Sequence, residues 1–253
     1  MELIISQSIK TLNDYCAGLL SKCIKEKNNA KIGLATGNTP IGIYQSLVSL
    51  FQSGEVDFTN VRTYNLDEYL GLPKSHPSSF YSFMRKHLID HLNLKEEHIN
   101  IPHGNIASPE QECIRYNHIL AQAGKFDVQI LGIGLNGHIG FNEPSAALSP
   151  HTHIVKLTEE TRRVNSPAFS SFDEVPTHAI TMGVASILRS KSILFMALGK
   201  EKSKIMKQAL EGPVTTQCPA SLLQLHPNCT VFLDEKAASE LDVKNDFYDV
   251  QYI

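Results

Sequence analysis

One stretch constrains this chain more than any other: ILGIGLNGHIGFNEP at residues 130–144. It continues an apolar run that opens after Asp127, too short for a typical helix and apolar on both faces, which predicts a strand buried in a parallel sheet. Glycines, an asparagine, His138 and Glu143 follow, and Pro144 ends regular pairing. Because open α/β sheets bind ligands at the carboxyl ends of their strands, this turn is the predicted catalytic centre.

Strands and helices alternate along the rest of the sequence. This order predicts one α/β domain over residues 1–253, with a doubly wound, mostly parallel, Rossmann-like sheet and helices on both faces. We expect the other strands at 31–35, 61–66, 99–101, 154–157, 178–182, 192–198 and 230–233. We expect helices at 6–27, 40–50, 78–91, 109–123, 183–189, 200–210 and 221–225, and a short one opened by Thr158. Residues 166–177 are expected to be irregular, and the tail 244–253 has no assigned role.

Composition excludes several classes of protein. The net charge of -3 argues against a nucleic-acid binder, which usually carries a basic surplus. No run of 18 apolar residues occurs and the first residues lack the basic start of a signal peptide, so we expect no membrane association. Five cysteines, an odd number without a C-x-x-C pair, favour a reduced, cytoplasmic protein.

Two further strand ends carry polar residues. Thr36, Gly37, Asn38 and Thr39 follow one strand, with Thr39 placed to cap the next helix and Pro40 at its first position. This turn is either a plain helix cap or a site where N–H groups hold a phosphate ester. Asp67-Glu68 follows another strand and is either a solvated loop start or a carboxylate base at the ligand edge. Adjacent residues of an extended chain point to opposite sides, so at most one of these acids faces the ligand.

Other motifs in the chain are weaker. Residues 132–137 match G-x-G-x-x-G, but a dinucleotide site requires that motif to open a helix, which Gly140 and Pro144 disfavour. The pairs His87/His91 and His151/His153 have no third ligand at suitable spacing. We therefore predict no metal, no organic cofactor and no covalent nucleophile. His138 with Glu143 five residues on is the better signal, an oriented acid/base pair.

Taken together, these residues resemble the glucosamine-6-phosphate deaminase family (glucosamine/galactosamine-6-phosphate isomerases). The matching stretches are GLATGNTP at 33–40, NLDEYLGLP at 65–73, GIGLNGHIGFNEP at 132–144 and LQLHP at 223–227. They occur in family order, so the resemblance covers about residues 1–240.

The resemblance implies an enzyme that converts glucosamine 6-phosphate and water to fructose 6-phosphate and ammonium. It assigns ring opening to His138, oriented by Glu143, and abstraction of the C2 proton to Asp67. Asn136 lies where many members have Asp, so it can position His138 but supplies no charge. The resemblance also assigns the phosphate to residues 36–39, with Lys202 as a cationic partner.

Two departures from the family pattern change these expectations. An Arg that helps to hold the phosphate in many members is missing, because Asn165-Ser166 is followed by Pro167-Ala168. Arg162 or Arg163 are the candidates to replace it. In allosteric hexameric members the loop after Glu-Pro carries basic and hydroxyl residues, whereas this chain has Ala146, Ala147, His153 and Val155. We therefore expect a monomer or small homo-oligomer without an allosteric phosphosugar site.

Two alternatives remain at this stage. One is a sugar-phosphate lactonase or isomerase of the same superfamily, which shares the Gly-x-Gly…Gly-His core but lacks the Asp-Glu-Tyr and Phe-Asn-Glu-Pro contexts. The other is a non-catalytic phosphosugar sensor, since related domains serve as effector modules of transcription regulators. Only one helix is expected before the first predicted strand, too little for an attached helix-turn-helix.

Overall fold

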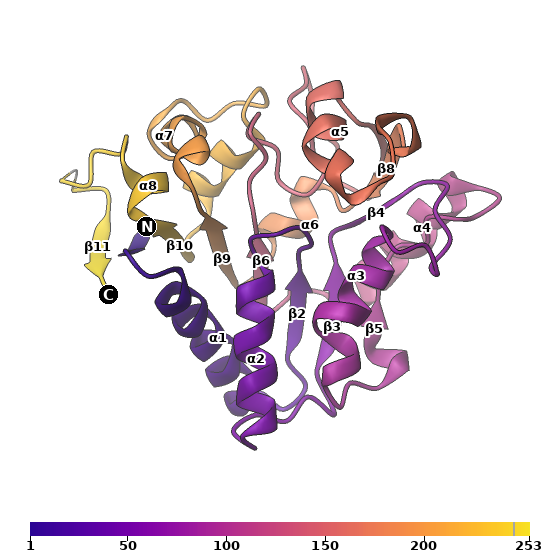
Figure 1. Cartoon of the computed structure of the whole chain (residues 1–253), viewed down its shortest axis with the longest axis horizontal. Coiled ribbons are helices and arrows are strands. Elements are labelled where there is room, and N and C mark those ends of the chain that lie inside the picture. The colour runs from indigo at the N-terminus through magenta and orange to yellow at the C-terminus, as the bar shows by residue number, and fades with distance from the viewer. Residues whose placement is uncertain (245) are drawn as a thin grey trace.

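The computed structural model describes residues 1–244 and 246–253. Within this part of the chain, the main sheet has eight parallel strands in the order β11-β1-β10-β9-β6-β2-β3-β5 (Figure 1). Its strands are β1 (Glu2–Ser6), β2 (Lys31–Leu34), β3 (Arg62–Asn65), β5 (Ile99–Asn100), β6 (Val128–Leu131), β9 (Ser192–Ala197), β10 (Cys229–Asp234) and β11 (Asp249–Tyr252). The predicted doubly wound parallel sheet is confirmed.

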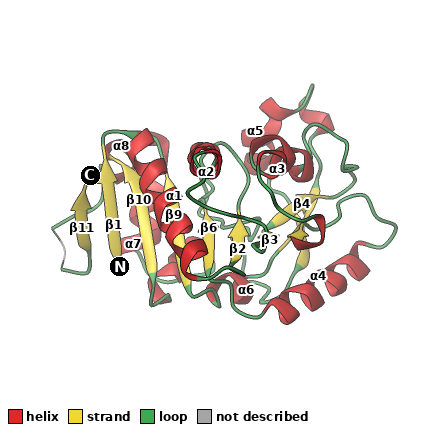
Figure 2. Cartoon of the chain, turned by 90° about the horizontal axis from the view of Figure 1, so that it is seen from below, coloured by secondary structure: helices red, strands yellow, loops and turns green. Residues whose placement is uncertain are grey.

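Helices cover both faces of this sheet. Figure 2 shows β6, β2 and β3 between α2 on one side and α4 with α6 on the other. The helices are α1 (Ile9–Glu26), α2 (Ile41–Gln52), α3 (Phe80–His87), α4 (Pro109–Ala123), α5 (Glu159–Asn165), α6 (Val184–Leu188), α7 (Ser203–Glu211) and α8 (Glu235–Ala238). One hydrophobic core joins the strands to these helices, and β6 is buried along its whole length. None of the helices in the described residues is long and apolar enough to cross a membrane.

A second, antiparallel sheet lies beside the main one. It contains β4 (Asp67–Tyr69), β8 (His178–Thr181) and β7 (His153–Lys156), in that order. The strands expected at 154–157 and 178–182 therefore exist, but they do not extend the parallel sheet. Tyr69 and Ala179 of the antiparallel sheet form a small buried hydrophobic cluster with Phe141 and Leu157. This small sheet ties the acidic strand β4 to the segments that carry α5.

Four details of the sequence-based expectations are wrong. A strand, β1, precedes the first helix, which begins at Ile9 rather than at residue 6. Helix α2 begins at Ile41, and Pro40 rather than Thr39 occupies its cap position, with no side-chain hydrogen bond. Ser79, not Ser78, caps α3 by accepting from Ser82 N.

The glycine-rich segment 132–137 forms turns and opens no helix, as expected.

The C-terminal tail has a structural role that the sequence did not reveal. Strand β11 pairs in parallel with β1 at the edge of the main sheet. Ser6 Oγ donates to the carbonyl of Ile253 at 2.6 Å, and Ile253 N donates to Ile5 O at 3.0 Å. The tail therefore completes the sheet on the side of β1, away from the predicted catalytic turn.

Candidate active site

The turn after β6 is held in a tight conformation that depends on glycine. Gly134 N donates to His138 O at 3.0 Å, and Gly137 has a φ of 88°, which favours glycine over other residues. A Cβ on Gly134 would lie 2.3 Å from Cε1 of His138, so any other residue here would push the imidazole out of this position. The glycines thus let the turn fold back on itself, so that the His138 ring packs against Gly134 at the start of the turn.

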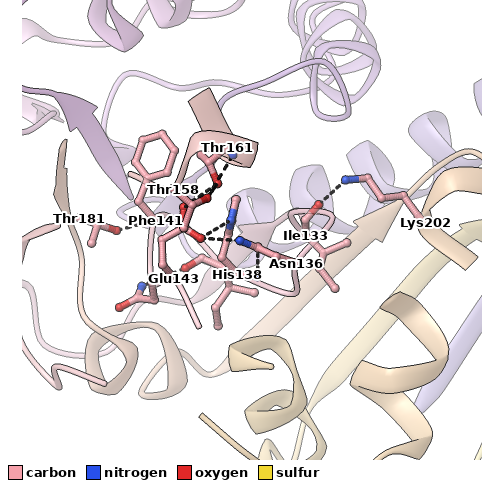
Figure 3. Close-up of polar contacts among 11 residues, drawn as sticks. Ile133, Asn136, His138, Phe141, Glu143, Thr158, Thr161, Thr181 and Lys202 are labelled. Carbon is pink, nitrogen blue, oxygen red and sulfur yellow. Dashed lines mark hydrogen bonds and ion pairs between the residues drawn. The ribbon is translucent and has the colours of Figure 1, made fainter. Parts of the chain in front are cut away.

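His138 and Glu143 lie together within this turn, as predicted. Nδ1 of His138 is 3.3 Å from Oε2 of Glu143 (Figure 3). This is an ion-pair distance without good hydrogen-bond direction, since Nδ1 has no well-aligned partner among the described residues. The contact leaves Nδ1 facing a carboxylate, which favours a proton on that nitrogen and orients the ring.

Asn136 completes the arrangement from the other side of the turn. Its Nδ2 donates to Oε2 of Glu143 at 2.6 Å, while its Oδ1 accepts from the backbone N–H of His138 at 3.2 Å. The amide therefore links both members of the pair. Although burial opposes ionisation, the contacts with His138, Thr161 and Asn136 lower the pKa of Glu143 to about 2.

Two threonines complete the setting of Glu143, and sequence reasoning gave them no part in the site. Thr161 Oγ1 in α5 donates to Oε1 of Glu143 at 2.6 Å, and Thr158 Oγ1 lies 3.5 Å from the same oxygen (Figure 3). Thr158 was expected only to open a helix, and it does cap α5 by accepting from Thr161 N. No spacing rule connects a helix cap with a carboxylate on a distant turn.

Asp67 lies against the same turn, beside Gly140. Its Oδ2 is 3.4 Å from the position that a Cβ on Gly140 would occupy, two residues beyond His138. Thr181 Oγ1 accepts from Phe141 N at 3.0 Å and anchors the turn to strand β8, which pairs with the Asp67 strand. Burial, and then the neighbouring charge of Glu68, raise the pKa of Asp67 to about 8.

Glu68 points away from this site, as the alternation of adjacent residues predicts. Its carboxylate accepts from Tyr69 N, Phe80 N and Tyr81 N, each at 2.9 Å, and so satisfies the first turn of α3. Burial raises the pKa of Glu68 to about 7, although these three N–H donors oppose the shift. Glu68 is therefore a buried helix cap beside the candidate base.

The candidate phosphate residues start from the strands on either side of β6. Residues 36–39 follow β2, and no side chain caps the first turn of α2 behind them, where the backbone N–H of Ile41 donates to Asn38 O at 3.4 Å. A helix N-terminus without a side-chain cap can accept an anion. Lys202 follows β9, and its Nζ donates to Ile133 O at 2.7 Å at the start of the catalytic turn (Figure 3). Burial lowers the pKa of its ammonium. Residues 36–39 themselves make no hydrogen bond to that turn within the described chain.

Of the two arginines proposed as a replacement for the missing phosphate ligand, Arg162 is already engaged elsewhere. Arg162 donates to the carbonyls of Phe172 and Val175 and lies over the Phe172 ring, 4.4 Å from its centroid. Arg163 is exposed and pairs with Glu159 at 3.2 Å. Lys202 is therefore the candidate cation that this structure places beside the turn. Across residues 1–244 and 246–253, no group of three His, Cys, Asp or Glu side chains is arranged to hold a metal ion.

A half-buried His138 beside the buried carboxylate of Glu143, a second buried carboxylate on Asp67, and Lys202 thus lie at the carboxyl edge of the parallel sheet, a set of groups that suits an enzyme acting on a phosphorylated sugar. The family model described as glucosamine-6-phosphate isomerases/6-phosphogluconolactonase matches residues 5–232. The chain belongs to this family, which confirms the resemblance found in its sequence.

Particular relatives within the family are deaminases. The chain is 46% identical over 239 residues to glucosamine-6-phosphate deaminase of Thermoanaerobacter pseudethanolicus, covering 94% of each protein. It is 43% identical over 245 residues to that of Clostridium botulinum, covering 97% of this chain and 98% of the relative. Among solved structures, a monomeric glucosamine-6-phosphate deaminase superposes with a TM-score of 0.93 at 42% identity, over 95% of this chain and 100% of the other.

Lactonases share the fold at much lower identity. The 6-phosphogluconolactonase of Trypanosoma brucei superposes with a TM-score of 0.73 at 18% identity, over 95% of this chain and 99% of that one. This likeness concerns the fold alone.

Proposed function

We propose that this chain converts glucosamine 6-phosphate and water to fructose 6-phosphate and ammonium. The observation that carries the proposal is the contact between the two halves of the site: Asp67 packs against Gly140, within the turn that presents His138. Identity of 43–46% to deaminases over nearly the whole chain supports the choice of substrate.

Ring opening requires a group that moves a proton between the anomeric hydroxyl and the ring oxygen. His138 can take and give this proton, because one nitrogen of an imidazole can accept a proton while the other carries one. Glu143 faces Nδ1 of the ring at 3.3 Å, so Nε2 is the nitrogen left to meet the sugar. The ionised carboxylate then stabilises the imidazolium that forms transiently.

Isomerisation requires a base at C2. The open-chain carbonyl makes the C2 proton acidic, Asp67 accepts it, and the proton is returned at C1. The product of this transfer is a C2 imine, to which water adds before the C–N bond breaks and ammonium leaves. A carboxylate with a pKa raised to about 8 by burial is a stronger base than an exposed one, and it suits a carbon acid of this kind.

The phosphate is assigned to Thr36, Gly37, Asn38 and Thr39, with Lys202 as the cation. The turn offers two hydroxyls, an amide and the N-terminus of α2, which no side chain caps. Lys202 brings a positive charge to the start of the catalytic turn, where Ile133 O already fixes its position. Together they would hold the phosphate end of the sugar while C1 and C2 reach the two acid/base groups.

A further part of the proposal concerns assembly and regulation. We propose a monomer or small homo-oligomer without activation by a second phosphosugar, because alanines and Val155 occupy the loop and strand positions where allosteric members carry basic and hydroxyl residues. The predicted outcome is a hyperbolic substrate curve that N-acetylglucosamine 6-phosphate does not change. The five cysteines are all free thiols, which suits a cytoplasmic enzyme.

The test is ammonium release from glucosamine 6-phosphate by the wild type and by Asp67→Asn. This change keeps the shape of the side chain and removes the base. We expect kcat to fall about 10²- to 10⁴-fold with little change in KM. Asp249→Asn is the matched control, because Asp249 is exposed and lies in β11, at the edge of the main sheet away from the catalytic turn. Wild-type binding without any ammonium release would overturn the proposal in favour of a sensor.

A further inference from the structure

Helix α5 donates a hydrogen bond to the carboxylate of the catalytic turn. Thr161 lies in the first turns of this helix, is 3% exposed, and its Oγ1 is 2.6 Å from Oε1 of Glu143. The two residues come from different segments, since β7 and the start of α5 follow the catalytic turn along the chain. A remote helix therefore contributes directly to the group that orients His138.

The two oxygens of Glu143 have different sets of partners. Oε2 accepts from Asn136 and faces His138, whereas Oε1 has Thr161 as its close donor and Thr158 only at 3.5 Å. The Glu143 side chain is buried, with 7% of its surface exposed. Loss of the Thr161 hydroxyl would leave Oε1 without a close donor in a place that water reaches poorly, which weakens the ionised form.

The direction of the Thr161 hydroxyl is set by the helix itself. Thr158 Oγ1 is 3.0 Å from Thr161 Oγ1 and can donate to it, which leaves the proton of Thr161 for Glu143. Thr158 also accepts from Thr161 N at 3.2 Å as the cap of α5. The next residue, Arg162, fixes the following loop through the carbonyl of Val175. The donor is therefore correctly aimed only when α5 is formed and seated.

We propose that Thr161 is a positioning residue: its hydroxyl fixes Glu143 in the orientation that holds His138, and so ties proton transfer at His138 to the seated α5 helix. The inference rests on the proposed deaminase function. A purely structural role for Thr161 would affect stability without changing how the site titrates.

Substituting Thr161 leaves the other charged groups near the turn unchanged. His138 is the ion-pair partner of Glu143 within the described residues, Asp67 packs against Gly140, and Lys202 bonds to Ile133. The first turn of α5 also carries Glu159 and Glu160. All of them remain when Thr161 alone is substituted, so a change in the pH profile reports the hydroxyl.

The test compares Thr161→Val, which keeps the shape but lacks the hydroxyl, with Thr161→Ser, which keeps the hydroxyl. The pH dependence of kcat and KM for ammonium release is measured for both. We expect Thr161→Val to lower kcat about tenfold, with KM within about twofold, and to add a further fall of kcat below about pH 4.5, where a carboxyl of ordinary pKa takes up a proton, while the limb set by Asp67 stays in place. Thr161→Ser should recover the wild-type profile. Thr177→Val, at an exposed threonine outside the site, is the matched control.

The other outcomes contradict either the inference or the proposed function. A wild-type profile in Thr161→Val, or equal losses in the Val and Ser variants, would overturn it. If Thr161→Val does not fold, Thr161→Ala removes the hydroxyl without a branched side chain and is judged by the same profile. A wild type that releases no ammonium would contradict the proposed function instead, which separates the two failures.

Discussion

Replacing Asn136 by Asp tests the electrostatics of the site, because it exchanges only the side-chain nitrogen for an oxygen. Nδ2 of Asn136 is 2.6 Å from Oε2 of Glu143 and donates to it. In Asn136→Asp an oxygen takes the place of that donor, so two carboxylates face each other at contact distance. The change alters charge and hydrogen bonding while keeping the size of the side chain.

The magnitude follows from that distance. Two unit charges 2.6 Å apart repel by about 6 kcal/mol at an effective dielectric constant of about 20, an upper bound for groups that can relax. Holding a proton at pH 7 on an aspartic acid of ordinary pKa costs about 4 kcal/mol. Repulsion exceeds this cost, so the pair should share one proton at neutral pH and lose it only at alkaline pH.

Kinetics and stability should both report this shared proton. Near pH 6 the protonated Asp can donate as the amide does, so Asn136→Asp should keep activity within about tenfold of the wild type. At alkaline pH the second carboxylate ionises, raises the proton affinity of His138 and removes the free base. We therefore expect a new alkaline limb in the profile of kcat/KM for ammonium release.

The sign of the stability change is opposite to that of Glu143 in the wild type. The pair in Asn136→Asp has a raised pKa, so the folded variant binds more protons than the unfolded chain from about pH 4 upward and loses stability as pH rises. Wild-type Glu143 has a pKa lowered to about 2, so its contribution is present above its ordinary pKa and is lost as pH falls towards 2. Thermal unfolding should therefore show that Asn136→Asp is less stable than the wild type, and that this deficit in the free energy of unfolding grows by a few kcal/mol between pH 5 and pH 8. A pH-independent difference, together with an unchanged kinetic profile, would refute the reasoning.

Two further predictions concern the phosphate and the base. Lys202→Met should raise KM for glucosamine 6-phosphate about 10- to 100-fold with a smaller effect on kcat, because a charge-assisted contact to phosphate is lost. Lys204→Met, at an exposed lysine of α7, is the control. An unchanged KM in Lys202→Met would show that Lys202 does not bind the phosphate. Glu68→Gln removes a charge that contributes, after burial, to the raised pKa of Asp67. Since Asp67 must be ionised to act, the acid limb of kcat/KM should move to lower pH, and a limb that does not move in a folded variant would contradict the assignment.

Elements with strong local signals could be predicted from the sequence. The helix at 109–123 has the predicted bounds, because Ser108 caps it and a proline occupies its first position. The contact of Asp67 with the His138 turn followed from one rule, that carboxyl ends of parallel strands share an edge. The sequence therefore indicated where the candidate acid/base residues come together.

Features that depend on tertiary pairing could not be predicted. Strand β1 is a short apolar run without a turn signal, and only pairing with β10 and β11 identifies it. The small antiparallel sheet is formed by three- and four-residue strands whose partners are distant in sequence. Thr161 looks like an ordinary helix residue, because its role depends on where α5 is seated rather than on any spacing.

The most direct test of the account is to offer the wild-type protein two substrates, glucosamine 6-phosphate and 6-phosphogluconolactone. A site with Asp67 at C2 and His138 at the ring oxygen should release ammonium and form fructose 6-phosphate from the first, with kcat on the order of 1–10³ s⁻¹, and leave the lactone at its spontaneous rate. Rapid hydrolysis of the lactone without ammonium release from the amino sugar would contradict it.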